Sequence, residues 1–320
     1  ARDRLQELPR DVPRAEELTL SPRIRRLAAI LASTGAAIAV ALFVLSAARP
    51  DGQALPSHEP DPAHGEVLYH VGGCISCHKA SANSGVTGLP TGQAPFETPV
   101  GTFWPGNLTP DLETGLGSWT AEQFVDAVRR GVSPDGRHYF PAFPYPSYRR
   151  MPVEDILDLW AYLQTLEPVH APGRAPDLPM PGMARRAVGL WKRLALGEPG
   201  FRPESERGEV WNRGAYLANG PGHCGECHPP RNALMIPDEG RAWAGGPHPR
   251  GDEGWVPSLL GLKGRGRYSD VSDLTLALQF GETLGYDKMS SGGMADVQMN
   301  LAMLPEEEVR AIAVYLLSVE

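Results

Sequence analysis

The sequence contains very little cysteine. Its 320 residues include only four, Cys74, Cys77, Cys224 and Cys227. They form two C-x-x-C pairs, and a histidine directly follows each pair, at His78 and His228. Because all four belong to this repeated pattern, none remains for a conventional disulfide bond. A cysteine-ligated thiosulfate-oxidising site, which needs one cysteine more, is excluded for the same reason.

The main part of the chain also lacks basic charge. The formal net charge of the chain is −8. Residues 1–49 contain eight Arg and five acidic residues, so their net charge is +3. The net charge of residues 50–320 is therefore −11. Nucleic-acid binding requires a basic face, so that function finds no support. An acidic body instead suits encounter with a basic protein partner.

Strand-like alternation of apolar and polar residues is absent, whereas Gly (36) and Pro (32) are abundant. The sequence therefore predicts a mainly α fold with many turns and loops. A helix is predicted from Thr120 to Arg130. Thr120 and Gln123 are predicted to form a capping box at its beginning, and Gly131 is predicted to end it. The other predicted helices cover approximately 153–166, 183–196, 272–280 and 306–319.

One long uncharged run, residues 27–48, stands near the beginning of the sequence. As a helix its 22 residues would reach roughly 33 Å, enough to cross the hydrocarbon core of a bilayer. Arg23, Arg25 and Arg26 precede it, so the positive-inside rule puts residues 1–26 in the cytoplasm and the rest of the chain outside. A cleavable signal peptide is the alternative, since Ser46 to Ala48 resemble a cleavage site, but the run is long for one. We expect a single-pass anchor in the bacterial cytoplasmic membrane.

An internal repeat follows a Pro-rich linker at 49–63. Each unit opens with a C-x-x-C-H motif and continues through a Gly/Pro-rich stretch, an amphipathic helix, a methionine and a closing helix. The predicted units are 64–167 and 207–320, with a Pro-rich strap between them at 168–206. The basic-apolar helix of the strap either connects the units or lies on a membrane surface.

C-x-x-C-H is the pattern for covalent haem attachment. Two cysteines three positions apart on one helical turn can form thioether bonds to a single haem, and the next histidine then lies under the iron. A thioredoxin-like motif would not need that histidine twice. A zinc site usually places its two pairs about 15–20 residues apart, whereas Cys77 and Cys224 are far apart along the chain. The sequence predicts two haem c groups.

The sixth iron ligands are predicted to be methionines. Met151 is the only methionine between His78 and the strap, and it lies just before a closing helix; His138 is its rival. In the second unit Met294 is favoured because its Gly-rich loop would let the backbone approach a haem edge. Met289, Met299 and Met303 remain alternatives, the last two with the spacing of packing residues. Histidine–methionine ligation leaves no open iron position and favours electron transfer.

Several long motifs resemble one family. These are GTFWPGNLTPDLETGLGSWT, GVSPDGRHYFPAFPYPSYRRM, WNRGAYLANGPGHCGECHPPRNAL and GGMADV. Through them, residues 64–320 resemble the multihaem cytochrome c subunits of bacterial membrane-bound alcohol, aldehyde and sugar-acid dehydrogenases. The resemblance implies class I-like cytochrome c domains, with Met151 and Met294 as ligands. A second methionine that is often found in the family corresponds to Phe143 in this chain. Those subunits usually carry three haems and attach to the membrane through a C-terminal segment, whereas here we expect two haems and an N-terminal anchor.

We therefore expect a membrane-anchored dihaem c-type cytochrome, not an enzyme, working on the periplasmic side. It would carry electrons from a respiratory or dehydrogenase donor to a soluble cytochrome or terminal oxidase. One alternative is a dihaem enzyme of the peroxidase or thiosulfate-oxidising type. Another is a permanent haem subunit of an oxidase or supercomplex.

Overall fold

The structure is a computed structural model, and the residues that it describes are 21–48, 54–179, 184–250, 254–265, 268, 270–283, 287–288 and 293–320. The chain divides into two compact units, with the boundary between Leu45 and Ser46. The first unit contains helix α1, and the second contains every other element that is described.

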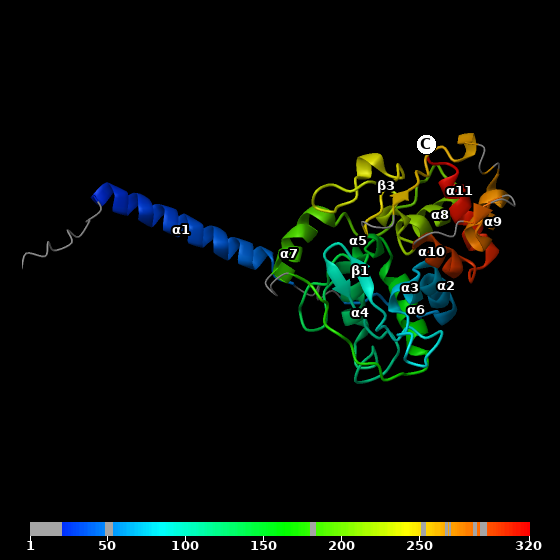
Figure 1. Cartoon of the computed structure of the whole chain (residues 1–320), viewed down its shortest axis with the longest axis horizontal. Helices are drawn as coiled ribbons and strands as arrows, with labels where there is room; N and C mark the ends of the chain where they lie inside the picture. Colours follow the sequence, from blue (N-terminus) through cyan, green and yellow to red (C-terminus); the bar gives the residue numbers. More distant parts are fainter. Residues whose placement is uncertain are drawn as a thin grey trace, which may run out of the picture. The chain divides into compact units, whose positions relative to one another are not determined.

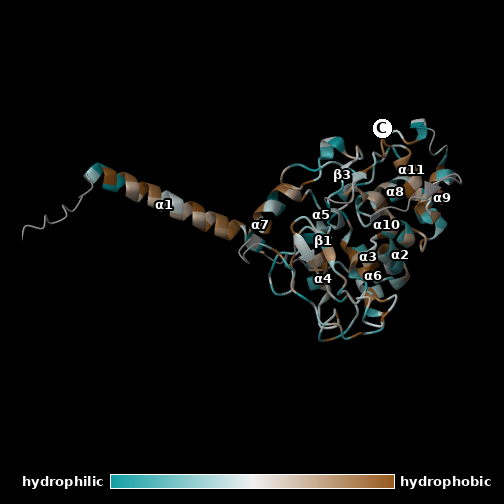
Figure 2. Cartoon of the chain, viewed as in Figure 1, coloured by the Kyte–Doolittle hydropathy of each residue, from teal (hydrophilic) through white to brown (hydrophobic). Residues whose placement is uncertain are grey.

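Helix α1 extends from Pro22 to Leu45 (Figure 1). Proline suits a first helical position because its missing N–H is not needed there. None of the side chains of α1 is buried in the protein, and its mean hydropathy reaches 2.3. Apart from its first turn, it is coloured mainly as hydrophobic in Figure 2. By length and composition α1 is able to cross a membrane, and it ends three residues before the predicted run does.

The first repeat, here called the first region, contains five helices and one small ladder. The helices are α2 (Pro62–Val71), α3 (Cys74–His78), α4 (Ala121–Arg130), α5 (Tyr145–Tyr148) and α6 (Val153–Gln164). Strands β1 (Phe96–Thr98) and β2 (Gly101–Phe103) pair antiparallel, with Phe96 opposite Phe103. Asp61 caps α2 through hydrogen bonds from the N–H groups of Ala63 and His64. The predicted capping box at Thr120 and the left-handed stop at Gly131 are both present.

The second repeat, the second region, has a similar plan with shorter helices. Its α-helices are α8 (Glu209–Asn219), α9 (Val271–Phe280), α10 (Gly293–Leu301) and α11 (Glu306–Leu316). Three 3₁₀ turns are η1 (Cys224–Glu226), η2 (Glu239–Arg241) and η3 (Lys263–Arg265). Two-residue strands form the antiparallel pairs β3 (Gly246–Pro247) with β4 (Trp255–Val256), and β5 (Glu282–Thr283) with β6 (Asp287–Lys288).

In each region the first and last long helices cross at a glycine. A Cβ atom on Gly65 of α2 would overlap the carbonyl oxygen of Asp158 on α6. A Cβ atom on Gly214 of α8 would overlap the carbonyl oxygen of Ala311 on α11. Only glycine permits so close a backbone approach. The sequence repeat is therefore also a repeat of helix packing.

Helix α7 (Ala184–Ala195) is fixed to the first region by a buried lysine. The ammonium group of Lys192 donates to the carbonyl oxygens of Arg130 (2.5 Å) and Gly131 (2.7 Å), at the C-terminal end of α4. It also donates to Nδ1 of His138 (3.1 Å). Burial, with the nearby Arg130, lowers the pKa of Lys192 to about 7. When it is protonated, Lys192 has an acceptor for each of its three protons and so holds α7 in place.

The mainly α prediction is confirmed, and the predicted helices that follow the apolar run agree with the observed ones to within about three residues, whereas α1 begins five residues before that run. Among the described elements, those not expected from the sequence include helices α2 and α8, the short helix α5, helix α10 and the β ladders, whose strands have only two or three residues. The β ladders are too short to produce a recognisable alternation.

Candidate functional site

The first motif lies on the five-residue helix α3. Gly73, directly before it, has a left-handed backbone (φ 57°) that turns the chain from α2 into α3. This places Cys74 and Cys77 on one helical turn, and neither forms a disulfide bond. Burial, followed by the proximity of Cys77, raises the pKa of the Cys74 thiol to about 12. Both sulfurs are held as the protonated thiols that a haem vinyl group would meet.

The second motif repeats this geometry on η1. His223 stands where Gly73 stands in the first motif, and it too has a left-handed backbone (φ 40°). Cys224 and Cys227 follow, again without a disulfide bond. Burial, and then Cys227, raise the pKa of the Cys224 thiol to about 12. A non-glycine residue at this φ carries some strain, so His223 is held there by its surroundings.

Each motif histidine is oriented by a backbone carbonyl. Nδ1 of His78 lies 2.7 Å from the carbonyl oxygen of Gly106, and Nδ1 of His228 lies 2.9 Å from that of Pro257. Since a carbonyl only accepts, the proton is on Nδ1 and the lone pair is on Nε2. This is the tautomer that an iron ligand requires. Burial also lowers the pKa of both imidazoles, which keeps them neutral.

The surroundings of the first motif fit a haem. The indole Nε1–H of Trp104 is buried and has no hydrogen-bond partner among the described residues, and the same is true of the Thr91 hydroxyl. Both lie close in sequence to residues that bond to His78: Thr91 precedes Gly92, whose N–H donates to the His78 carbonyl (2.7 Å), and Trp104 lies two residues before Gly106, whose carbonyl accepts from the His78 ring. Buried donors without partners call for an acceptor. A haem propionate has that chemistry.

Met151 is buried in the core of the first region, with 1% of its surface exposed. It lies between α5 and α6, and Pro152 begins α6 directly after it. Its rival His138 has both ring nitrogens engaged: Nε2 donates to the carbonyl of Ser46 (3.0 Å) and Nδ1 accepts from Lys192 (3.1 Å). This leaves Met151 as the candidate that is not committed to another bond.

The expectation from the sequence that Met294 lies in a loop is wrong. Met294 is in the first turn of α10, half-buried against the hydrophobic core. The glycines before it suggested a loop, but Gly293 is instead the first residue of α10. Met299 and Met303, which were expected to pack, are 60% and 65% exposed. Met289 lies outside the described residues.

The two motifs lie next to each other in the second unit. The carbonyl oxygen of Gly72, two residues before Cys74, accepts from the Tyr148 hydroxyl (3.2 Å) and lies 3.3 Å from Nε2 of His223. The Tyr148 and His223 rings meet edge to face, with centroids 5.7 Å apart. On the other side of the first motif, the Asn300 side chain on α10 donates to the Ser76 hydroxyl (2.8 Å).

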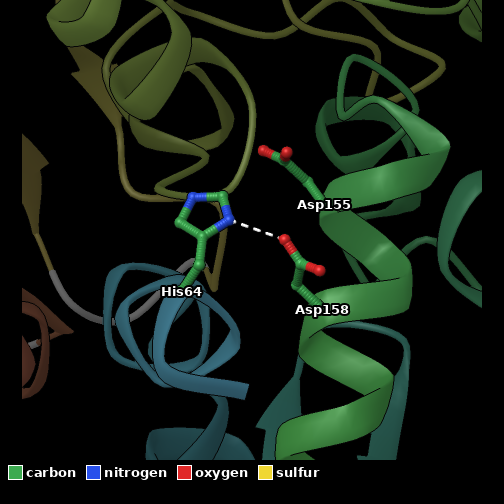
Figure 3. Close-up of side chains that lie close together, drawn as sticks. All are labelled: His64, Asp155 and Asp158. Carbon is green, nitrogen blue, oxygen red and sulfur yellow. Dashed lines mark hydrogen bonds and ion pairs between the residues drawn. The ribbon is translucent and has the colours of Figure 1, made fainter. Parts of the chain in front are cut away.

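A polar cluster also joins the regions, and the sequence analysis did not identify it (Figure 3). The buried carboxylate of Asp158 on α6 accepts hydrogen bonds from His58 Nε2 (2.6 Å), His64 Nδ1 (2.8 Å) and the Asp61 N–H (2.8 Å). Burial alone would raise the pKa of Asp158, but these bonds outweigh it and the pKa is lowered. A charged residue among the apolar positions of α6 was the available signal in the sequence.

The same cluster reaches the second region through α8. Nη2 of Arg213 lies 3.5 Å from Nε2 of His64 and binds Glu308 at 2.7 Å. The Tyr216 hydroxyl donates to Asp155. One nitrogen of His64 and one oxygen each of Asp155 and Asp158 lie within 4.8 Å of one another, as in a metal site.

Hydrogen bonding accounts for this grouping better than a metal does. His64 donates from Nδ1 to Asp158 and accepts from Arg213 at Nε2, so both of its ring nitrogens are engaged by side chains. A metal ion on Nδ1 would turn the Nε2–H against the Arg213 guanidinium. We interpret the cluster, here called the clasp (His58, His64, Asp155, Asp158, Arg213, Tyr216), as a polar connection between the two regions.

Comparison with known proteins agrees with this geometry. Residues 62–167 match the cytochrome c family. The chain is 39% identical over 293 residues to a protein of Cereibacter sphaeroides named diheme cytochrome c-type, covering 91% of this chain and 97% of that protein. It is 35% identical over 271 residues to the fructose dehydrogenase cytochrome subunit of Gluconobacter japonicus, covering 82% of this chain and 53% of the subunit.

Another relative is larger still. A subunit of nicotinate dehydrogenase from Pseudomonas putida is 37% identical over 256 residues, which cover 80% of this chain but 21% of that protein. The chain therefore spans about half of one dehydrogenase subunit and a fifth of the other, but nearly all of the Cereibacter protein. The chain belongs to the family of dihaem c-type cytochromes that is related to the cytochrome subunits of bacterial dehydrogenases.

Proposed function

We propose that this chain is a membrane-anchored electron carrier that accepts electrons from a dehydrogenase and passes them to a cytochrome or terminal oxidase outside the cytoplasm. As a dihaem c-type cytochrome it carries two covalently bound haem c groups, and it is an electron-transfer protein, not the catalytic subunit.

The proposed iron ligands are His78 with Met151 and His228 with Met294. When bound, each haem supplies a one-electron couple, and a methionine ligand raises its reduction potential. The chain's contribution is to hold the imidazole lone pairs toward the iron through the carbonyls of Gly106 and Pro257. It also keeps the Met151 thioether buried, away from water.

The observation that carries the proposal is the contact between the two attachment motifs. Gly72 O and His223 Nε2, each just before a motif, are 3.3 Å apart, and Tyr148 fills the space beside them. A chain built for two independent reactions would have no need to bring its motifs together. The contact supports exchange of electrons within one molecule, with one region facing the donor and the other the acceptor.

A dehydrogenase is the favoured donor because of the relatives. One of them is named as the cytochrome subunit of a fructose dehydrogenase, and another as a subunit of nicotinate dehydrogenase. The acceptor is proposed from charge: residues 50–320 sum to −11, which favours a basic electron acceptor. Helix α1 is the proposed anchor, with residues 1–26 in the cytoplasm and both regions in the periplasm.

The test is purification of the tagged full chain in mild detergent from bacterial membranes. We expect two covalent haems per chain after denaturation, both low-spin and six-coordinate in the native protein, and a dehydrogenase that copurifies and reduces them with its substrate. A fixed stoichiometry would make the chain a permanent subunit of that enzyme. A stable five-coordinate haem with rapid peroxide turnover would instead establish a peroxidase and overturn the proposal.

A further inference from the structure

The first residue after the apolar helix is held by the body of the protein. Ser46 directly follows Leu45, the last residue of α1, and only 6% of its surface is exposed. Its carbonyl accepts a hydrogen bond from His138 (3.0 Å), and its hydroxyl accepts one from Arg186 of α7 (3.4 Å). A Cβ atom on Gly189 of α7 would overlap the Ser46 carbonyl, so glycine is required there.

This contact changes the role of the predicted linker. Residues 49–63 follow Ser46 in the chain, so they cannot act as a tether between the apolar helix and the body. The attachment point is Ser46 itself, and it belongs to the same compact unit as both haem regions. With α7 held in turn by Lys192, the body has a fixed surface at the residue where the chain leaves the apolar helix.

That surface carries exposed apolar side chains on α7 and on a neighbouring turn. Leu194 is 70% exposed, and Leu234 and Met235 are 53% and 45% exposed. Trp191 joins the two segments, because its indole N–H donates to the carbonyl of Leu234 (2.8 Å). We call these four residues together with the exposed Arg193 the α7 patch. Helix α7 contains four basic residues and no acidic residue.

The patch is close to the membrane by chain geometry. Gly189 of α7 contacts Ser46, and Leu194 lies five residues after Gly189. Along the axis of α7, Leu194 is therefore about 7.5 Å from the point of contact with Ser46. The headgroup layer on each side of a bilayer is roughly 5–7 Å thick. Tryptophan and leucine suit the boundary between headgroups and acyl chains, and arginine suits anionic lipid headgroups.

We infer that the α7 patch is a seat on the membrane: it contacts the phospholipid surface, so that the body is held against the bilayer and does not swing on a linker. The inference rests on the proposed anchor and adds a defined lipid-facing side. A seated body presents its haems only to partners in or on the same membrane, which restricts the donor and the acceptor to those within reach of the surface.

The experiment uses the full chain in nanodiscs of phosphatidylcholine and phosphatidylglycerol. The four native cysteines are bound to haem, so a single cysteine can be introduced and spin-labelled. Leu194→Cys and Leu234→Cys probe the patch, and Leu112→Cys, at a position 71% exposed, is the matched control. We expect labels at 194 and 234 to relax more with oxygen, which concentrates in lipid, than with a water-soluble nickel chelate. The label at 112 should show the reverse.

Three other outcomes are possible, and each tests the membrane contact of the α7 patch separately from the proposed electron transfer. If the protein enters the discs but the labels at 194 and 234 are as accessible to nickel as that at 112, the seat is wrong and the anchor stands. If the protein does not enter the discs, both are wrong, while the haem content still tests the electron carrier. If the labels become protected only when a dehydrogenase is added, the patch is a protein interface and the lipid seat is wrong.

Discussion

At the scale of single residues, two carbonyl groups control the two proposed iron ligands. Gly106 follows His78 by 28 residues and Pro257 follows His228 by 29, and each accepts the Nδ1 proton of its histidine. The almost equal separation reflects the repeat, in which the same loop returns beneath each motif. Because these acceptors are backbone atoms, side-chain substitution cannot remove them. The candidate ligands on the other side of each haem are side chains and can be tested directly.

If Met151 is the iron ligand that we propose, replacing it by leucine should remove the methionine ligand of one haem while that haem stays attached. Leucine has a similar volume, so the fold should persist, but the iron of the first region loses its thioether ligand and its reduction potential falls. We expect the near-infrared charge-transfer band of ferric methionine-ligated haem to fall by about half. Met299→Leu, at an exposed position, is the control and should leave the band unchanged. An undiminished band in the Met151 variant would assign the ligand elsewhere.

The clasp should make stability depend on pH through His58. Its hydrogen bond with Asp158 raises the pKa of His58 above the ordinary 6.5. A group whose pKa is raised on folding stabilises the protein fully below its unfolded pKa, and the stabilisation is lost as pH rises through the folded pKa. The contribution of His58 to the thermal midpoint should therefore fall as pH is raised from 6.5, while Lys192, whose pKa is lowered on folding, contributes in the opposite direction over the same range.

The matching variants are His58→Asn and Glu59→Gln. The first removes the titrating group, so the difference in thermal midpoint between the native protein and this variant should shrink as pH rises above 6.5, in thermal scans followed by tryptophan fluorescence. The second changes an exposed neighbouring side chain outside the clasp, and it should keep the native slope. Equal slopes for His58→Asn and the native protein would show that the clasp does not titrate there.

At the scale of elements, α4 shows how a helix can be fixed by its ends. Thr120 accepts from Gln123 N–H (3.3 Å), and Gln123 returns a bond to the Thr120 N–H (2.9 Å). Thr120→Ala removes the cap and should lower the free energy of unfolding by about 1 kcal/mol. Thr120→Ser keeps the hydroxyl and should restore most of it. Urea unfolding of the three proteins, followed by far-ultraviolet circular dichroism, measures the difference.

The helix crossings should tolerate change far less than the caps. In Gly214→Ala the new methyl group meets the carbonyl of Ala311, so α8 and α11 must separate. We expect a loss of about 3 kcal/mol, at the upper end of the range for overpacking. Gly173→Ala, where a Cβ atom meets nothing within 4 Å, is the control. If both variants unfold at the same urea concentration, the crossing is not as close as described.

The elements that could be predicted are those with local signals. Helix α4 has a capping box and a left-handed glycine, and α11 begins after Pro305, so their positions follow from neighbouring residues. Helix α10 has no such signal. Its Asn300 bonds to Ser76 in the other region, a contact between residues far apart in sequence. The position of Met294 in a helix therefore could not be read from the glycines around it.

The candidate site divides in the same way. The cysteines and histidines of the motifs, and the choice of Met151, follow from sequence order alone. The carbonyl acceptors, the engagement of His138 by Ser46 and Lys192, and the clasp depend on tertiary contacts. These contacts join residues that no sequence pattern links. A buried charge such as Lys192 becomes intelligible only when its three acceptors are seen together.

At the scale of the molecule, the charge of the chain is divided about the apolar helix. Residues 50–320 sum to −11, and Arg23, Arg25 and Arg26 precede or begin the apolar stretch. If the body lies in the periplasm, it reaches the compartment where haem c is attached and where cysteines meet an oxidising environment. Attachment of the haems then requires that the chain be inserted with its N-terminal arginines in the cytoplasm and residues 50–320 in the periplasm.

Reversing these charges should therefore prevent haem attachment. In a variant with Arg23, Arg25 and Arg26 all changed to glutamate, the positive-inside signal is lost and the body is retained in the cytoplasm in a large share of molecules. Covalent haem, measured by haem staining of denatured gels against total protein, should fall several-fold. The triple lysine variant keeps the charge and should stain like the native chain. Full staining of the glutamate variant would mean that these arginines do not set the orientation, and that the side on which the haems lie is decided by another part of the chain.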